Sequence, residues 1–205
     1  MRFCLLFIVF GCVKEEGEAP PNPFADAVFS FSPAADATYG QDKMPQVVLG
    51  GPEGGGETGS LDVVSLGDGG EIVLEFLDIE LTDGEGPDLL VFENPFSGWY
   101  ETGIVSASED AETWHEWPCD PLDVESDYPG CAGVGLVWAN STNDIDSTDP
   151  ESAGGDAFDL ADIGLETAAY IKIVDSGANT YDSESSGFDL DAIAVVNGTI
   201  RNHGS

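Results

Sequence analysis

The stretch Asp88-Leu89-Leu90-Val91-Phe92-Glu93 gives the strongest indication of the fold class. Its four central residues are branched or aromatic, and Gly86-Pro87 and Asn94-Pro95 bound it, which is the pattern of a β-strand. Seven other segments of similar character are predicted strands: 46–49, 61–66, 71–78, 103–108, 134–139, 168–174 and 190–196. No long run keeps a helical period, and only residues 158–165 favour a short helical turn. The sequence therefore predicts an all-β protein, a single jelly-roll-like β-sandwich with long acidic loops.

The charge balance excludes several classes of partner. The chain of 205 residues carries 40 Asp and Glu against 5 Lys and Arg, a formal net charge of −35. Binding to nucleic acid or to anionic lipid depends on Lys and Arg, so neither is expected. At the same time, 41% hydrophobic residues is far more than a disordered acidic tail contains, and the length favours one folded domain.

The N-terminus has the pattern of a secretory signal peptide. Arg2 precedes an apolar run over residues 3–10, which is too short to span a bilayer as a helix. Residues 9–12 (Val-Phe-Gly-Cys) resemble the bacterial lipobox, which implies cleavage before Cys12 and lipidation of that cysteine. The alternative is an ordinary signal peptide with a chance cysteine.

The expected organisation follows from this reading of the N-terminus. Residues 1–11 form the signal peptide, and residues 12–27, which are polar and rich in proline, form a lipidated cysteine and a flexible tether. The β-sandwich then occupies residues 28–199, followed by a tail over residues 200–205. The expected location is the bacterial cell envelope, with an outer-membrane lipid anchor as the only membrane contact.

Two cysteines remain in the predicted folded domain. Cys119 and Cys131 are separated by eleven residues, and in an oxidising compartment such a pair most simply forms a disulfide. A zinc site is the alternative, but only His115 lies nearby, and the usual set of four ligands is lacking.

Three acidic segments, residues 83–88, 154–162 and 187–191, are candidates for calcium binding. Turns that carry several carboxylates offer a hard cation many oxygen ligands, although none of these segments has EF-hand spacing. Burying carboxylates beside apolar residues such as Phe188 is costly without a counter-charge, and basic residues are few. The alternative is a set of solvated surface acids. The expected ligands are Asp88, Glu93, Asp189 and Asp191, followed by Asp83, Asp156 and Asp159.

No catalytic signature is present. A Ser-His-Asp triad would need His115 or His203, and no Gly-x-Ser-x-Gly motif occurs. The many acids permit a glycosidase pair, but the sequence singles out none. Trp99 and Tyr100 are candidate ligand-binding residues, because aromatic faces beside carboxylates suit sugar recognition; a purely structural role in the sandwich is the alternative.

The pattern of several segments resembles a family of uncharacterised bacterial secreted or cell-surface proteins. The segments are 48–52, 59–67, 83–88, 91–96, 154–160 and 187–193, and the likeness spans about residues 40–197. Residues 105–114 also resemble the strand-turn-strand motif VSxDGxxW of discoidin-like, galactose-binding-like sandwiches, with Ala111 in place of the usual turn glycine. The segment 187–193 is similar to the last strand of those domains. This resemblance implies a sandwich that contains a structural calcium ion. Loops at one end of such a sandwich bind carbohydrates or proteins.

The sequence thus favours a non-enzymatic, surface-exposed lipoprotein, a calcium-stabilised β-sandwich that binds an extracellular carbohydrate or a protein partner. A secreted hydrolase acting on polysaccharide and a purely structural envelope protein are the alternatives.

Overall fold

The computed structural model describes residues 21–94, 96–178 and 183–201. The predicted signal peptide, Cys12 and the first part of the predicted tether lie outside these ranges. Among the described residues, no helix is long and apolar enough to cross a bilayer.

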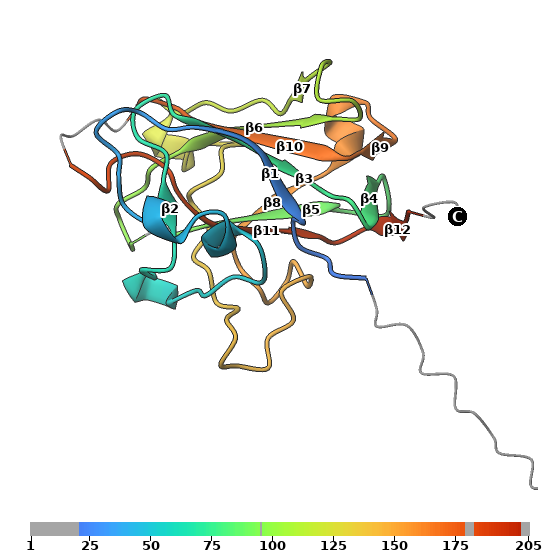
Figure 1. The fold of residues 1–205 in the computed structure, drawn as a ribbon, viewed down its shortest axis with the longest axis horizontal. Helices are drawn as coiled ribbons and strands as arrows, with labels where there is room; N and C mark the ends of the chain where they lie inside the picture. Colours follow the sequence, from blue (N-terminus) through green and yellow to red (C-terminus); the bar gives the residue numbers. More distant parts are fainter. Residues whose placement is uncertain (1–20, 95, 179–182, 202–205) are drawn as a thin grey trace, which may run out of the picture.

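The protein is an all-β sandwich, and every paired strand in the described ranges is antiparallel (Figure 1). The larger sheet has five strands in the order β1 (Ala27–Ser32), β3 (Glu71–Glu75), β10 (Tyr170–Asp175), β6 (Gly103–Ser108), β7 (His115–Glu116). The second sheet has the order β2 (Val64–Ser65), β11 (Asp189–Val195), β5 (Leu89–Glu93), β8 (Asp156–Phe158). A small third sheet contains β12 (Gly198–Ile200), β4 (Ile79–Thr82) and β9 (Thr167–Ala168).

The helical content is limited to five 3-10 turns in the described ranges. They are η1 (Gln41–Lys43), η2 (Gln46–Val48), η3 (Gly56–Thr58), η4 (Val124–Ser126) and η5 (Leu160–Ile163). The predicted helical turn at 158–165 is confirmed in its central part by η5, where the side chain of Asp159 caps the first turn by accepting from the N–H of Ala161.

The main core lies between the two larger sheets. In β10, the buried Ile171 and Ile173 alternate with the partly exposed Tyr170, Lys172 and Val174, as expected for a strand with one face toward the core. Leu190 and Ile193 of β11 pack into the same cluster from the opposite sheet.

The second sheet is buried on both faces. Leu89 and Val91 of β5 belong to the main core, whereas Leu90 and Phe92 pack in a separate cluster with residues of the 137–153 segment. This segment covers the outer face of the sheet below β11 and β5 in Figure 1. Double coverage explains why residues 89–92 of β5 and 192–195 of β11 are apolar without alternation.

Some predicted strands differ from the structure. The segment 46–49 forms η2 instead, because a short apolar run that follows a proline is equally compatible with a helical turn. The segment 134–139 contributes only an isolated bridge between Val137 and Gly154. Five strands were not predicted, namely β1, β4, β7, β8 and β12; they are short, polar or largely exposed.

The packed region begins before the predicted boundary at residue 28. Phe24 bridges to Ala194, and Ala25 is buried in the main core. The predicted disulfide between Cys119 and Cys131 is present, and it closes the loop that contains η4. At Ala111 the backbone has a φ of 60°, the left-handed region that glycine adopts most readily.

Candidate metal centre

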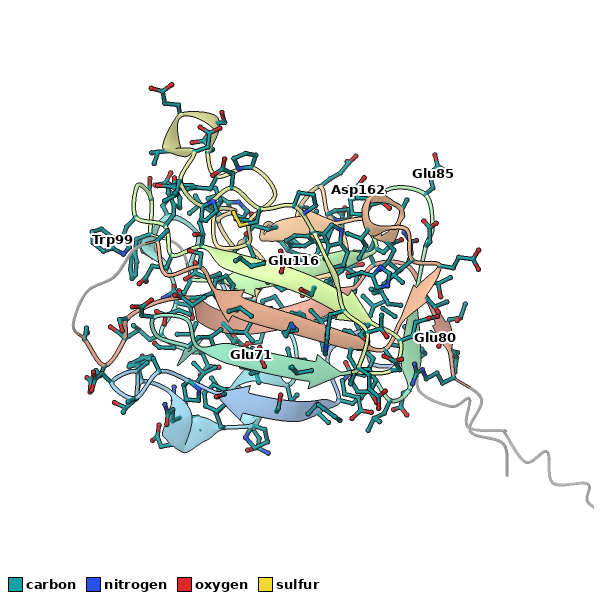
Figure 2. All side chains as sticks on the ribbon, turned by 90° about the horizontal axis from the view of Figure 1, so that it is seen from above. Glu71, Glu80, Glu85, Trp99, Glu116 and Asp162 are labelled. Carbon is teal, nitrogen blue, oxygen red and sulfur yellow. A yellow bond between two sulfur atoms is a disulfide. The ribbon has the colours of Figure 1, made fainter. Side chains whose placement is uncertain are left out.

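The strand β5 separates two clusters of carboxylates. Asp88 precedes the strand and Glu93 ends it, about 17 Å away at the usual rise per residue. Among the described residues, one cluster contains Asp83, Asp88 and Asp159, and the other contains Glu93, Glu101 and Asp189; within each, the ligand oxygens lie within 4.8 Å of one another. Figure 2 shows the two ends: Glu85, next to the first cluster in sequence, and Trp99, between Glu93 and Glu101 in sequence, project from opposite ends of the molecule.

The second cluster is built from three adjacent pieces of chain. Glu93 is the last residue of β5, Asp189 is the first residue of β11, and Glu101 lies just before β6. Because β5 and β11 are antiparallel neighbours, the end of one strand and the start of the other meet at the same edge of the sheet. All three side chains are buried, with exposed fractions of 2% for Glu93 and 7% for Glu101 and Asp189.

Glu93 has an unpartnered oxygen inside this cluster. Its Oε1 accepts from the N–H of Asp189 at 3.3 Å, whereas its buried Oε2 has no hydrogen-bond partner. Burial, and then the charges of Asp189 and Glu101, raise the pKa of Glu93 well above its usual value. A buried carboxylate oxygen without a donor costs free energy unless a proton or a cation satisfies it.

Asp189 is held beside Glu93 by its own contacts. Its Oδ1 accepts from the hydroxyl of Ser65, the residue opposite it on β2. Burial raises the pKa of Asp189 to about 7; the Ser65 hydroxyl opposes this shift and the charge of Asp175 adds to it.

Glu101 and the acid Asp175, which is outside the cluster, fix the backbone just before Asp189. The Glu101 carboxylate accepts from the N–H of Gly187 at 2.9 Å, and Asp175 accepts from the N–H of Phe188 at 2.8 Å. Gly187 has a φ of 75°, and a side chain there would come within 2.9 Å of the Asp175 carboxylate, so the close approach requires glycine. The segment that carries Asp189 is thus fixed by acids on neighbouring strands.

Side-chain cations do not neutralise the second cluster within the described residues. Lys43 pairs with Asp62, and Arg201 pairs with Glu80, each at 3.2 Å. The Nζ atom of Lys172 lies over the ring of Trp114, 4.5 Å from the ring centre, in a cation–π contact. The charge of the second cluster is therefore left for protons or for a bound cation to balance.

The first cluster is satisfied by the protein itself. The two carboxylate oxygens of Asp88 accept from the N–H groups of Gly84 and Leu160 and from the amide of Asn197, at 2.9 to 3.0 Å. Asp159 caps η5, and Asp83 is exposed. Asp88 therefore organises two loops, and among the described residues of this cluster no buried carboxylate oxygen lacks a hydrogen-bond partner.

Two predicted ligands belong to neither cluster. Asp191 accepts from the N–H of Glu53, and burial raises its pKa to about 8. A register shift, or bulge, interrupts the pairing of β11 with β5 between Leu190 and Ala192, so strict alternation does not hold from Asp189 through Asp191. Asp156 accepts three backbone N–H groups of residues 133–135, at 2.7 to 3.1 Å, and fixes that loop.

The two predicted ligand-binding aromatics have different surroundings. Trp99 is 49% exposed, projects from one end of the molecule (Figure 2) and precedes Glu101 by two residues in sequence. Tyr100 is partly buried and packs edge-on against Tyr128, with the ring centres 5.9 Å apart.

Sequence reasoning found Glu93 and Asp189 but missed Glu101 and Asp175. Glu101 lies in an irregular segment without a strand pattern, and Asp175 lies at the end of β10. Only the pairing of β10 with β6 brings Glu101 to Gly187 and Asp175 to Phe188.

Comparisons with protein-family models and with curated proteins find no match to this chain.

Proposed function

We propose that Glu93, Glu101 and Asp189 bind one divalent cation and that this cation stabilises a non-catalytic binding domain. The observation that carries the proposal is the buried Oε2 of Glu93, which lacks a hydrogen-bond donor and belongs to a carboxylate grouped with those of Glu101 and Asp189. A cation would satisfy this oxygen and would offset both the burial and the repulsion by Asp189 and Glu101 that raise the pKa of Glu93.

Calcium fits the donor set best. The three side chains offer only oxygen atoms, whereas zinc in proteins is usually held by His and Cys. Calcium accepts six to eight oxygen ligands in variable geometry, and backbone carbonyls and water commonly complete its shell. Magnesium requires a stricter octahedron and keeps more of its water, which suits a buried cluster less well.

A binding role is favoured over hydrolysis of polysaccharide. The acids of the second cluster have exposed fractions of 7% or less, so a sugar chain does not reach them in this conformation. The cation would instead brace the loop between Glu93 and Glu101, which presents the exposed Phe96 and Trp99. We propose an extracellular carbohydrate or a protein surface as the partner of this loop.

Two measurements on the purified chain test this role: its binding to a glycan array and its capture of proteins from the cell envelope. We expect binding in 1 mM calcium that falls by about tenfold or more in Trp99→Ala, because exposed aromatic residues dominate such contacts. Trp138→Ala is the matched control, since Trp138 is exposed to a similar extent, 45% against 49%, and belongs to a different loop. Equal losses in the two variants, or no bound glycan and no protein captured from the envelope, would exclude the loop as a recognition surface.

The proposed location is the cell envelope, with Cys12 as a lipid anchor. This rests on the lipobox-like residues 9–12. We expect the mature protein to begin at Cys12 and to partition into detergent, and Cys12→Ser to be released in soluble form or to remain uncleaved. A different mature N-terminus in a protein that stays in the aqueous phase would refute the anchor.

A further inference from the structure

A cavity of about 490 Å³ opens beside the disulfide loop, and its lining does not include Glu93, Glu101 or Asp189. Its walls come from β8, from η5, from the segment after β7 and from the loop closed by Cys119 and Cys131. This volume lies in the range of pockets that bind small organic molecules. In Figure 2, the disulfide and Asp162, which both border the cavity, lie on the same side of the molecule.

The walls combine aromatic rings with acids. Trp117 and Phe158 pack against each other with ring centres 5.2 Å apart, and Trp117 is fixed by a hydrogen bond from its ring N–H to the Asp159 carbonyl. Tyr128 borders the cavity from the disulfide loop, where Tyr100 supports its ring. The aromatic part of the wall is therefore held rigidly.

Three carboxylates line the same cavity. Asp156 is fixed by the backbone N–H groups of residues 133–135, and Asp127 and Asp162 are exposed. None of the described lining residues is Lys, Arg or His, so no side chain of the wall balances these charges. Anionic ligands are therefore disfavoured, and cations are attracted.

We propose that this cavity binds a small organic cation, a molecule that carries one or more primary ammonium groups on a short carbon or sugar scaffold. The ammonium groups pair with Asp127, Asp156 and Asp162, and the scaffold packs against Trp117, Tyr128 and Phe158. A bare metal ion fits less well, because these acids are not among the carboxylate groups that converge within coordinating distance.

The test is calorimetric titration of the purified full-length chain in 1 mM calcium and 150 mM NaCl. Three probes separate the sources of the same chemistry: spermidine, the disaccharide of glucosamine, and its N-acetylated form, which keeps the sugar shape and loses the charge. We expect saturable binding of spermidine or of the glucosamine disaccharide with one molecule per chain, and no binding of the N-acetylated sugar. Equal binding of the charged and the acetylated disaccharide would overturn the proposal, because the cavity would then recognise sugar and not charge.

Variants locate the site. Asp127→Asn with Asp162→Asn removes two rim charges at exposed positions, and asparagine tolerates the left-handed backbone at residue 127. We expect the affinity for the bound cation to fall by about tenfold or more. Asp144→Asn with Glu151→Gln makes the same charge change at exposed acids elsewhere and should change the affinity less than about twofold.

Equal losses in the two double variants, or no saturable binding of any probe, would show only the general attraction of an acidic protein and would refute the site.

Discussion

Calcium at 1 mM is expected to raise the melting temperature of the protein by about 5–10 °C. A ligand that binds only the folded state at a hundredfold excess over its Kd adds about 2.7 kcal/mol. For a domain of this size, each kcal/mol corresponds to about 2–4 °C. Differential scanning calorimetry in calcium and in NaCl of matched ionic strength separates specific binding from screening of the −35 net charge.

The double variant Glu93→Gln with Asp189→Asn should lose the calcium-specific part of this shift and keep the screening part. Asp144→Asn with Glu151→Gln removes the same charge from exposed positions and should keep both parts. A calcium shift that survives in the first variant would place the cation elsewhere or reduce the effect to screening.

The stability of the metal-free protein should fall as the pH rises from 5.5 to 8. The pKa of Glu93 is raised by burial and by neighbouring charges, and burial raises that of Asp189 to about 7. Because the folded state holds these protons more tightly than the unfolded state, their stabilising effect is full below about pH 4. The part from Asp189 is lost as the pH rises through about 7, and the part from Glu93 is lost as the pH rises through its own raised pKa. In chelator, the melting temperature should therefore be higher at pH 5.5 than at pH 8. Calcium competes with these protons, so its stabilising effect should be larger at pH 8.

Replacement of Asp88 by alanine should be the most destabilising single change at the other end of β5. Asp88 is fully buried, and its loss leaves the N–H groups of Gly84 and Leu160 without their acceptor. The Asn197 amide loses one hydrogen bond and keeps the one to the Pro87 carbonyl. We expect a loss of about 3–5 kcal/mol in the free energy of unfolding, measured by urea denaturation. The exposed Asp83→Ala is the control from the same cluster and should cost less than about 0.5 kcal/mol.

The response of the Asp88 variant to calcium separates the two clusters. Its melting temperature should be low in chelator and should still rise in calcium by the same increment as the original protein. Loss of the increment in Asp88→Ala together with its retention in Glu93→Gln would move the cation to the first cluster and reverse the assignment. If Asp88→Ala does not fold, Asp88→Asn, which keeps one acceptor oxygen, provides the same comparison.

Local sequence pattern was sufficient for the elements that the core determines. The strands β5, β6 and β11 were predicted within one residue of their bounds, because buried apolar runs between Gly, Pro and Asp leave few alternatives. The weaker strands depend on pairing partners distant in sequence. β8, for example, has only three residues and exists because it pairs with β5.

The same distinction applies to the acids. Glu93 and Asp189 were predicted because each adjoins a strongly apolar strand. Glu101 was missed because only tertiary structure brings its loop to Gly187. Asp191 was assigned to the same face as Asp189 by strict alternation, and the bulge in β11 is invisible in a single sequence. At Asp88 and Asp156, backbone N–H groups satisfy the carboxylate without a cation. Composition does not distinguish an acid that is satisfied in this way from an acid that binds a metal ion.

Long-wavelength anomalous diffraction from crystals grown with calcium can locate the bound cation. We expect an anomalous peak between the carboxylates of Glu93, Glu101 and Asp189, with calcium–oxygen distances of about 2.3–2.6 Å. Peaks found only at Asp83, Asp88 and Asp159, or only at exposed acids, with the Oε2 of Glu93 bound by a proton or a water molecule instead, would contradict this expectation.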